Sequence, residues 1–195
     1  MERSADIERK TRETDIQLRL NLDGKGLSSI DIDIPFLGHM FELMTAHGFM
    51  DLNVKAKGDI EIDYHHTVED LGICLGKAIN QALGDKKAIK RYGQAMIPMD
   101  ESLAQVVIDI SNRPYLSYDV PLNRNMTGKF DVDLLEEFFR ALVNYARITM
   151  HIKLISGSDA HHIAEAIFKA FARALDQASQ REERLDDVPS TKGIL

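Results

Sequence analysis

The sequence predicts an α+β fold made of two similar halves in tandem, each a small sheet with two helices. Three observations predict it. Apolar residues alternate in some segments and recur at helical spacing in others, the order of these segments is repeated, and the same short motif opens the last helix of each half. With 195 residues, of which 44% are hydrophobic, the chain can bury a substantial core.

Two strands are expected near the start of the first half. Apolar residues alternate from Ile16 to Leu22 and again from Ile30 to Ile34. Residues 23–26 between them are Asp-Gly-Lys-Gly, a composition typical of a turn. This pattern predicts a β-hairpin with one buried face, and Pro35 ends its second strand.

A helix, a strand and a longer helix are expected next. Apolar residues recur at helical spacing from Phe36 to His47, and residues 52–56 return to a period of two. A long helix with most of its faces covered is then expected from His65 to Gly84.

The second half repeats this order. Its strands are expected at 104–110, 115–120 and 148–155, and its helices at 133–147 and 159–181. A shift of 98 residues pairs Phe41 with Phe139 and Lys55 with Lys153, and a shift of 96 pairs the two motifs residue by residue. We therefore expect one half at residues 1–95 and another at 96–195, the second ending in the tail 189–195.

Each half carries an HHxxE motif at the start of its last helix. The motif residues are His65, His66 and Glu69 in the first half and His161, His162 and Glu165 in the second. On a helix the first His and the Glu share a face, whereas the second His points about 100° away. We therefore expect adjacent histidines to serve different metal ions, with further ligands from another helix or another subunit. One motif alone would be equally typical of a capped helix start, but two in corresponding positions favour a metal site.

Further ligands are expected on the helix that precedes each motif. His39 lies on the first of these helices, and a shift of 98 residues pairs it with Glu137, which can also bind a metal. Taken alone, Glu137 is more typical of a solvated helix surface. His47 lies two turns after His39 and either contacts a metal or a substrate or caps the helix end. Imidazole and carboxylate ligands without thiolate suit Mn, Fe, Co or Zn.

The charge balance argues against several kinds of partner. The chain has 24 Lys and Arg against 31 Asp and Glu, for a formal net charge of −7, which disfavours nucleic acid and anionic membrane surfaces. No apolar stretch approaches the length of a membrane span, and the first residues are too charged for a secretory signal, so a cytoplasmic protein is expected. An anionic ligand would need a local cluster of basic side chains.

At residues 65–70 the sequence HHTVED resembles the imidazoleglycerol-phosphate dehydratase family. Other segments that fit the family pattern are RETDI near Glu13, PFLGHM at 35–40, HGFMDL at 47–52, GDIEIDY at 58–64, RYG at 91–93, PMDESL at 98–103, SNRPYL at 111–116, HHIAEAIFKAFARAL at 161–175 and PSTKGIL at 189–195. The resemblance covers nearly the whole chain.

This resemblance implies an activity, an assembly and a set of site residues. The activity is dehydration of D-erythro-imidazoleglycerol phosphate to imidazole-acetol phosphate in histidine biosynthesis, with two Mn²⁺ ions per active site. The assembly is a homo-oligomer of 24 subunits with active sites at subunit interfaces, and the fold has the helices packed between the two sheets. The implied metal ligands are His39, His65, His66, Glu69, His161, His162 and Glu165, with an eighth at Glu137. The implied substrate-site residues are Glu13, His39, His47, Arg91, Arg113, Lys169, Ser190, Thr191 and Lys192.

Two catalytic roles are expected from the same resemblance. Removal of a carbon-bound proton needs a positioned carboxylate, and Glu13 is the expected general base, with His47 assisting proton transfer. Two positions depart from the family pattern: Gly38 replaces a common Asp, and Glu137 replaces the His of many members. A carboxylate can still bind manganese, so the second departure bears on the eighth ligand more than on the activity.

Two other interpretations stay open. A dinuclear metallohydrolase acting on phosphate esters would use the same ligand types. A noncatalytic protein whose metal ions bridge subunits or are buffered would also carry paired motifs. Glu13 and the basic residues count against the noncatalytic protein, because bridging requires neither.

Overall fold

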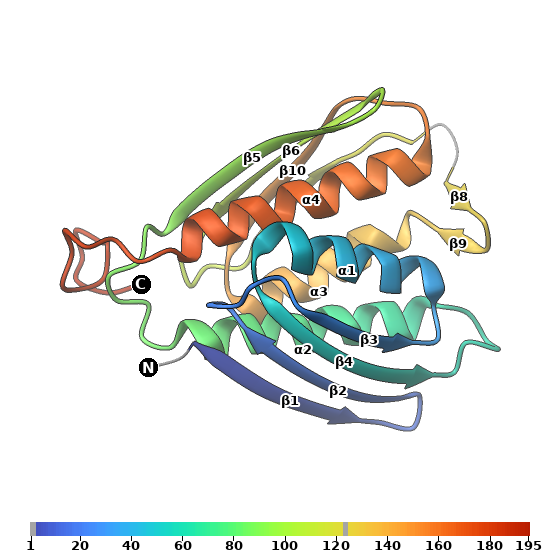
Figure 1. Ribbon diagram of the computed structural model, residues 1–195, viewed down its shortest axis with the longest axis horizontal. Coiled ribbons are helices and arrows are strands. Elements are labelled where there is room, and N and C mark those ends of the chain that lie inside the picture. Colours follow the sequence, from blue (N-terminus) through green and yellow to red (C-terminus); the bar gives the residue numbers. More distant parts are fainter. Residues whose placement is uncertain (1–2, 123–124) are drawn as a thin grey trace.

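Across residues 3–122 and 125–195, which the computed structural model describes, two four-stranded sheets enclose four helices (Figure 1). The first sheet contains β1 (Ser4–Lys10), β2 (Thr14–Asn21), β3 (Ser28–Ile32) and β4 (Asp51–Gly58). The second contains β5 (Tyr92–Met99), β6 (Ser102–Asp109), β7 (Tyr115–Asp119) and β10 (Thr149–Ser156), and a short ribbon pairs β8 (Met126–Thr127) with β9 (Phe130–Asp131). The helices are α1 (Pro35–Gly48), α2 (His65–Leu83), α3 (Leu134–Ala146) and α4 (Ala160–Ser179).

The two sheets have the same topology. Their strand orders are β1-β2-β4-β3 and β5-β6-β10-β7. In each sheet the first three strands are antiparallel and the last pair is parallel. The predicted α+β fold of two similar halves, with helices between the sheets, is confirmed. Strand β5 spans the expected division between residues 95 and 96.

The predicted hairpin between residues 16–22 and 30–34 is wrong. Strand β4 lies between them, antiparallel to β2 and parallel to β3. The Asp51 carboxylate accepts hydrogen bonds from the backbone N–H groups of Lys25 at 2.8 Å and Leu27 at 2.9 Å. These bonds hold the loop after β2 against the start of β4. An alternating pattern shows which face of a strand is buried but does not identify its neighbour.

One of the two edge strands of each sheet, β1 in the first and β5 in the second, is not predicted from the sequence. The segment SADIERK of β1 has one fully buried residue, Ala5, and β5 contains Gly93 and Pro98. Neither segment has the clear apolar alternation of β2 or β6. These strands are held by main-chain pairing with their neighbours, which a side-chain pattern reveals poorly.

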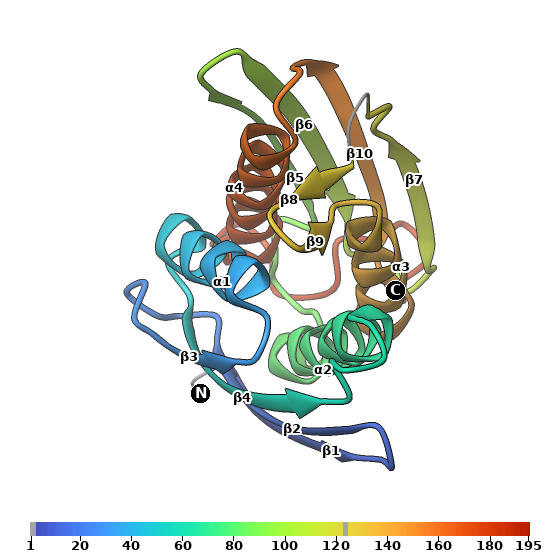
Figure 2. The same ribbon diagram turned by 90° about the vertical axis from the view of Figure 1, so that its right-hand side faces the viewer.

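The helices pack across the boundary between the halves. Figure 2 shows α1 beside α4 and α2 beside α3, between the two sheets. Glycines allow α2 and α3 to approach closely: a Cβ atom at Gly72 would lie 2.4 Å from the carbonyl oxygen of Phe138, and one at Gly76 would lie 2.5 Å from that of Leu142. In the described part of the chain, every helix is too short or too polar to cross a membrane.

Candidate functional site

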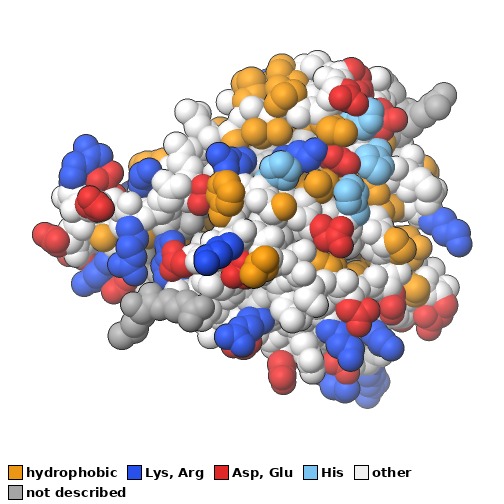
Figure 3. Space-filling model, in the orientation of Figure 1, with side chains coloured by type: hydrophobic (Ala, Val, Ile, Leu, Met, Phe, Trp, Pro, Cys, Tyr) orange, Lys and Arg blue, Asp and Glu red, His pale blue; other side chains and the backbone are white. Residues whose placement is uncertain are grey.

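Three predicted ligands from two helices converge at one place. Nε2 of His39 on α1 lies 3.1 Å from Oε1 of Glu165 on α4, and Nε2 of His161 lies 3.0 Å from the same oxygen. One ligand atom from each residue lies within 4.8 Å of the others, and residues 3–122 and 125–195 contain one such group. Figure 3 shows histidine side chains gathered on one face beside acidic and basic side chains. The packing of α1 on α4 therefore creates a three-ligand cluster.

The carboxylate at the centre of this cluster is nearly buried. The side chain of Glu165 is 9% exposed, and Nζ of Lys169, one turn later on α4, lies 2.6 Å from its Oε2. Burial raises the pKa of Glu165, but hydrogen bonds from Lys169, His39 and His161 outweigh it and lower the pKa to about 2. Glu165 is therefore an anion at neutral pH, as a metal ligand must be.

The first motif forms a looser group. Nε2 of His65 lies 3.9 Å from Oε2 of Glu69, so the two share a helix face, and both side chains are more than 40% exposed, at 44% and 48%. Glu137 does not join them: its Oε1 lies 4.0 Å from Nε of Arg140 on the same helix. Among the described residues, His65, Glu69 and Glu137 do not form a second three-ligand cluster.

The second histidine of each motif points elsewhere and has its own carboxylate. Nδ1 of His66 lies 2.9 Å from Oδ2 of Asp59, and Nδ1 of His162 lies 2.7 Å from Oε2 of Glu101. Each of these bonds raises the pKa of its histidine. In both motifs the adjacent imidazole rings are 86° apart in orientation. A carboxylate at Nδ1 leaves Nε2 as the nitrogen that can bind a metal.

Asp59 and Glu101 are functional candidates that sequence reasoning did not single out. Asp59 lies in the loop that leads into α2, seven positions before His66, and Glu101 lies in the β5–β6 turn, 61 positions before His162. The signal that could have found them is chemical rather than positional: a metal-binding histidine needs a hydrogen-bond acceptor for its other nitrogen.

The two predicted catalytic residues lie beside the ligand groups. Glu13 is exposed in the turn between β1 and β2, where Thr11 Oγ1 accepts its N–H at 3.0 Å, and its charge contributes to the raised pKa of His66. Burial, followed by the charges of Lys169 and Arg173, lowers the pKa of His47. His47 is therefore largely uncharged at neutral pH and close to Lys169.

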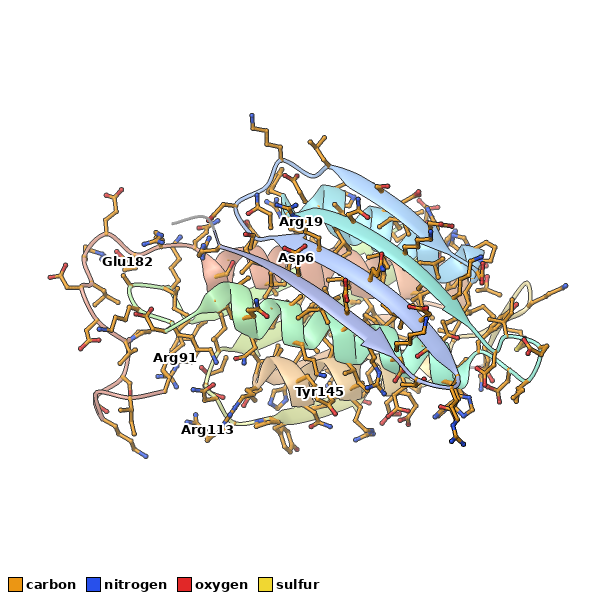
Figure 4. The ribbon with its side chains drawn as sticks, turned by 90° about the horizontal axis from the view of Figure 1, so that it is seen from below. Asp6, Arg19, Arg91, Arg113, Tyr145 and Glu182 are labelled. Atoms are coloured by element: carbon orange, nitrogen blue, oxygen red, sulfur yellow. The ribbon has the colours of Figure 1, made fainter. Side chains whose placement is uncertain are left out.

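The remaining predicted substrate residues gather at the opposite end of the molecule. Arg91 pairs with Asp109, with Nε 2.7 Å from Oδ1, and donates to the carbonyl of Pro189 at 2.8 Å. Arg113, 67% exposed, lies 3.5 Å from the same Asp109. Figure 4 shows both arginines at the end that carries the C-terminal tail. That tail contains Ser190, Thr191 and Lys192.

The ligand cluster and the arginine group cannot meet within one chain. The N–H of Arg91 donates to the carbonyl of Ala178 at 2.9 Å, so Arg91 lies at the C-terminal end of α4. Glu165 lies near the start of that helix. At 1.5 Å per residue the two places are about 20 Å apart. Lys169 is the one predicted phosphate-binding residue that lies beside the cluster.

Comparisons with known proteins agree on one family. A family model described as imidazoleglycerol-phosphate dehydratase matches residues 32–175. Over 195 residues and the full length of both chains, the sequence is 54% identical to the imidazoleglycerol-phosphate dehydratase of Acetivibrio thermocellus and 55% identical to that of Geobacter sulfurreducens. The crystal structure of the enzyme from Staphylococcus aureus is 44% identical, with a TM-score of 0.83, and the match covers 91% of this chain and 99% of that one. The enzyme from Pyrococcus furiosus in complex with (S)-C348 is 38% identical, with a TM-score of 0.84 over 97% of this chain and 100% of that one.

Proposed function

The chain belongs to the imidazoleglycerol-phosphate dehydratase family, and from this premise we propose that it removes water from D-erythro-imidazoleglycerol phosphate to give imidazole-acetol phosphate. The family resemblance predicted from the sequence motifs is confirmed. The protein is a lyase of histidine biosynthesis. Its substrate, its product and its metal dependence are the proposed part.

The convergence of His39, His161 and Glu165 carries this proposal. Two imidazole nitrogens and one carboxylate oxygen within 4.8 Å of one another are donors that Mn²⁺ accepts, and no thiol lies among them to favour a softer metal. We propose two Mn²⁺ ions per active site. Their proposed ligands are His39, His65, His66, Glu69, Glu137, His161, His162 and Glu165. When bound, the ions supply Lewis acidity to the imidazole ring and hydroxyl groups of the substrate.

The active site is proposed to combine residues of more than one subunit. The separation of about 20 Å between Glu165 and Arg91 along α4 supports this, because one small phosphorylated substrate cannot span both groups in a single chain. The second histidines support it too, since their Nε2 atoms are left for ligation away from the first histidines. A closed homo-oligomer, for which we propose 24 subunits, would bring these surfaces together.

The side chains can divide the elimination between them. The carboxylate of Glu13 accepts the carbon-bound proton, the neighbouring hydroxyl takes up a proton that His47 relays from solvent and leaves as water, and the resulting enol becomes the ketone. His47, uncharged at neutral pH, can pass a proton between the substrate and solvent. The phosphate dianion needs local cations in a protein of net charge −7, and Lys169, Arg91 and Arg113 are the proposed donors.

An assay of metal-stripped protein tests this function. Protein treated with a chelator is incubated with imidazoleglycerol phosphate before and after Mn²⁺ is added back, and the acetol product is measured. We expect product only after Mn²⁺ addition. Release of inorganic phosphate without acetol product would instead support the phosphate-ester hydrolase. Metal-dependent assembly without any turnover would support the noncatalytic protein.

A further inference from the structure

Glu101 occupies the position in the second half that Glu13 occupies in the first. Strand β2 begins at Thr14 and β6 begins at Ser102, so each glutamate immediately precedes the second strand of its hairpin. The two hairpins are equivalent in sheets of identical strand order. The same place in the repeat therefore holds the same residue type, and its surroundings can be compared directly.

The Glu101 carboxylate is held by four donors. Its Oε1 accepts the N–H of Asp159 at 2.9 Å, the N–H of Ser158 at 3.2 Å and the hydroxyl of Ser102 at 2.9 Å. Its Oε2 lies 2.7 Å from Nδ1 of His162. One oxygen thus joins the β5–β6 turn to the start of α4, while the other contacts the motif histidine.

This arrangement determines which nitrogen of His162 carries the proton. An ionised carboxylate only accepts hydrogen bonds, so His162 must donate from Nδ1. In the uncharged ring Nε2 then carries the lone pair that a metal requires. Glu101 therefore selects the tautomer and fixes the ring orientation at the same time.

The carboxylate of Glu13 lacks the hydrogen bonds that hold Glu101 in the described part of the chain. It is exposed, and within residues 3–122 and 125–195 no side chain or backbone N–H donates to its carboxylate. In the first half the histidine at the equivalent motif position, His66, is instead held by Asp59, whose side chain is 13% exposed. The two halves thus support their second histidines with carboxylates from different loops.

We infer that Glu101 is a positioning residue that presents Nε2 of His162 to a metal ion, and that the repeat has divided the roles of its two hairpin glutamates. Glu13 stays free to accept a proton, while Glu101 is committed to its histidine. This inference rests on the proposed use of metal. It adds that removal of the Glu101 charge acts through metal binding, without contact between Glu101 and the substrate.

The variant Glu101→Gln tests the inference with Mn²⁺ alone as the probe. The amide oxygen can keep the bonds from Asp159 and Ser158, but the amide NH₂ then faces Nδ1 of His162 and can only donate. The proton is displaced to Nε2, which blocks ligation. Calorimetric titration of metal-stripped protein with Mn²⁺ is expected to show affinity at one class of sites lowered about 10- to 100-fold.

Controls separate this inference from the proposed function. Glu8→Gln, an exposed carboxylate on β1, is expected to bind Mn²⁺ as the unchanged protein does. If the unchanged protein binds no Mn²⁺, the proposed function fails. If it binds Mn²⁺ and Glu101→Gln binds equally well, with the same thermal midpoint in the metal-free state, the inference alone is overturned.

A conservative variant covers the case in which Glu101→Gln does not fold. Glu101→Asp keeps the charge but is one methylene shorter, so it cannot reach both the α4 start and His162. Its Mn²⁺ affinity is expected to fall less than that of Glu101→Gln, but measurably. Unchanged affinity in Glu101→Asp would overturn the positioning role.

Discussion

Nζ of Lys169 lies 2.6 Å from Oε2 of Glu165, one turn earlier on α4, and both side chains are nearly buried. The other oxygen of that carboxylate faces His39 and His161. The lysine therefore offsets part of the charge of a proposed metal ligand. Among the residues proposed to donate hydrogen bonds to the substrate phosphate, it also lies nearest the ligand cluster.

Lys169→Met is expected to separate these two roles. Loss of a charge-assisted bond to phosphate should raise the Michaelis constant for the phosphorylated substrate about 10- to 100-fold. Mn²⁺ affinity should rise, because a positive charge is removed beside a cation site. Steady-state kinetics and Mn²⁺ titration measure the two effects. An unchanged Michaelis constant would show that Lys169 does not bind the phosphate and only forms an ion pair with Glu165.

Glu13→Gln is expected to lower kcat about 10²- to 10⁴-fold, because the amide cannot accept the carbon-bound proton. Glu13 is exposed and its backbone, not its carboxylate, is held by Thr11, so the thermal midpoint and Mn²⁺ affinity should not change. Glu8→Gln on β1 is the matched control and should keep full activity. An unchanged kcat in Glu13→Gln would show that Glu13 is not the general base.

The contrast between the motif histidines and Arg91 shows how far the sequence could predict the site. The helical spacing of each motif predicts which histidine shares a face with its glutamate, and the structure has that geometry at His65 and at His161. Arg91 lies far from the ligand cluster, at the other end of α4. No spacing rule reveals this, since it depends on how the two sheets enclose the helices.

The sequence likewise predicts the helices of the fold but not the order of the strands in its sheets. Helices are specified by local periodicity, so α1, α2, α3 and α4 are close to the expected ranges. Sheet neighbours depend on pairing between distant segments, and β4 could not be placed between β2 and β3 from alternation alone. Glu101 was missed for a related reason, because its contact joins a turn to a helix 61 positions away. Asp59 is only seven positions before His66, but it lies in an irregular loop to which no helical or strand spacing applies.

Variants at Glu137 test the proposed eighth metal ligand. Here Glu137 pairs loosely with Arg140, at 4.0 Å, rather than with the first motif. We expect Glu137→Ala to weaken Mn²⁺ binding about tenfold or more, and Glu137→His to retain it, because imidazole is an equivalent donor. Glu136→Gln, the neighbouring exposed carboxylate, is the control. Equal Mn²⁺ binding by Glu137→Ala and the unchanged protein would exclude Glu137 as a ligand.

Gly72→Ala tests the close approach of α2 and α3. The added Cβ would lie 2.4 Å from the carbonyl oxygen of Phe138, so the helices must separate, at a cost of about 1–3 kcal/mol in the free energy of unfolding. Gly38→Ala on α1 is the control, because its Cβ would meet only Ile30 Cγ2 at 3.7 Å. There the helical preference of alanine should stabilise by up to about 1 kcal/mol. Urea unfolding at one protein concentration should show these opposite signs, and two shifts of the same sign would contradict the prediction.

The buried Lys86 predicts a rise in stability at alkaline pH. Its side chain donates to the amide oxygens of Asn80 and Asn112, and burial, followed by the charge of Arg147, lowers its pKa to about 8. An unfolded lysine keeps its proton up to about pH 10.4. Between pH 8 and 10 the unfolded chain therefore binds more protons than the folded chain, and stability rises with pH in this window.

Lys86→Met should remove that rise, because the side chain no longer titrates. The free energy of unfolding of the unchanged protein should gain about 1–2 kcal/mol from Lys86 between pH 8 and 10, relative to the variant. Lys87→Met is the matched control, since the neighbouring Lys87 side chain is 52% exposed. Urea midpoints are measured at pH 8 and pH 10. The change in midpoint between these pH values should differ from that of the unchanged protein for Lys86→Met and should equal it for Lys87→Met. If the midpoints of both variants change with pH as that of the unchanged protein does, Lys86 keeps its proton in the folded chain. Its two asparagine acceptors would then be sufficient to hold the charge.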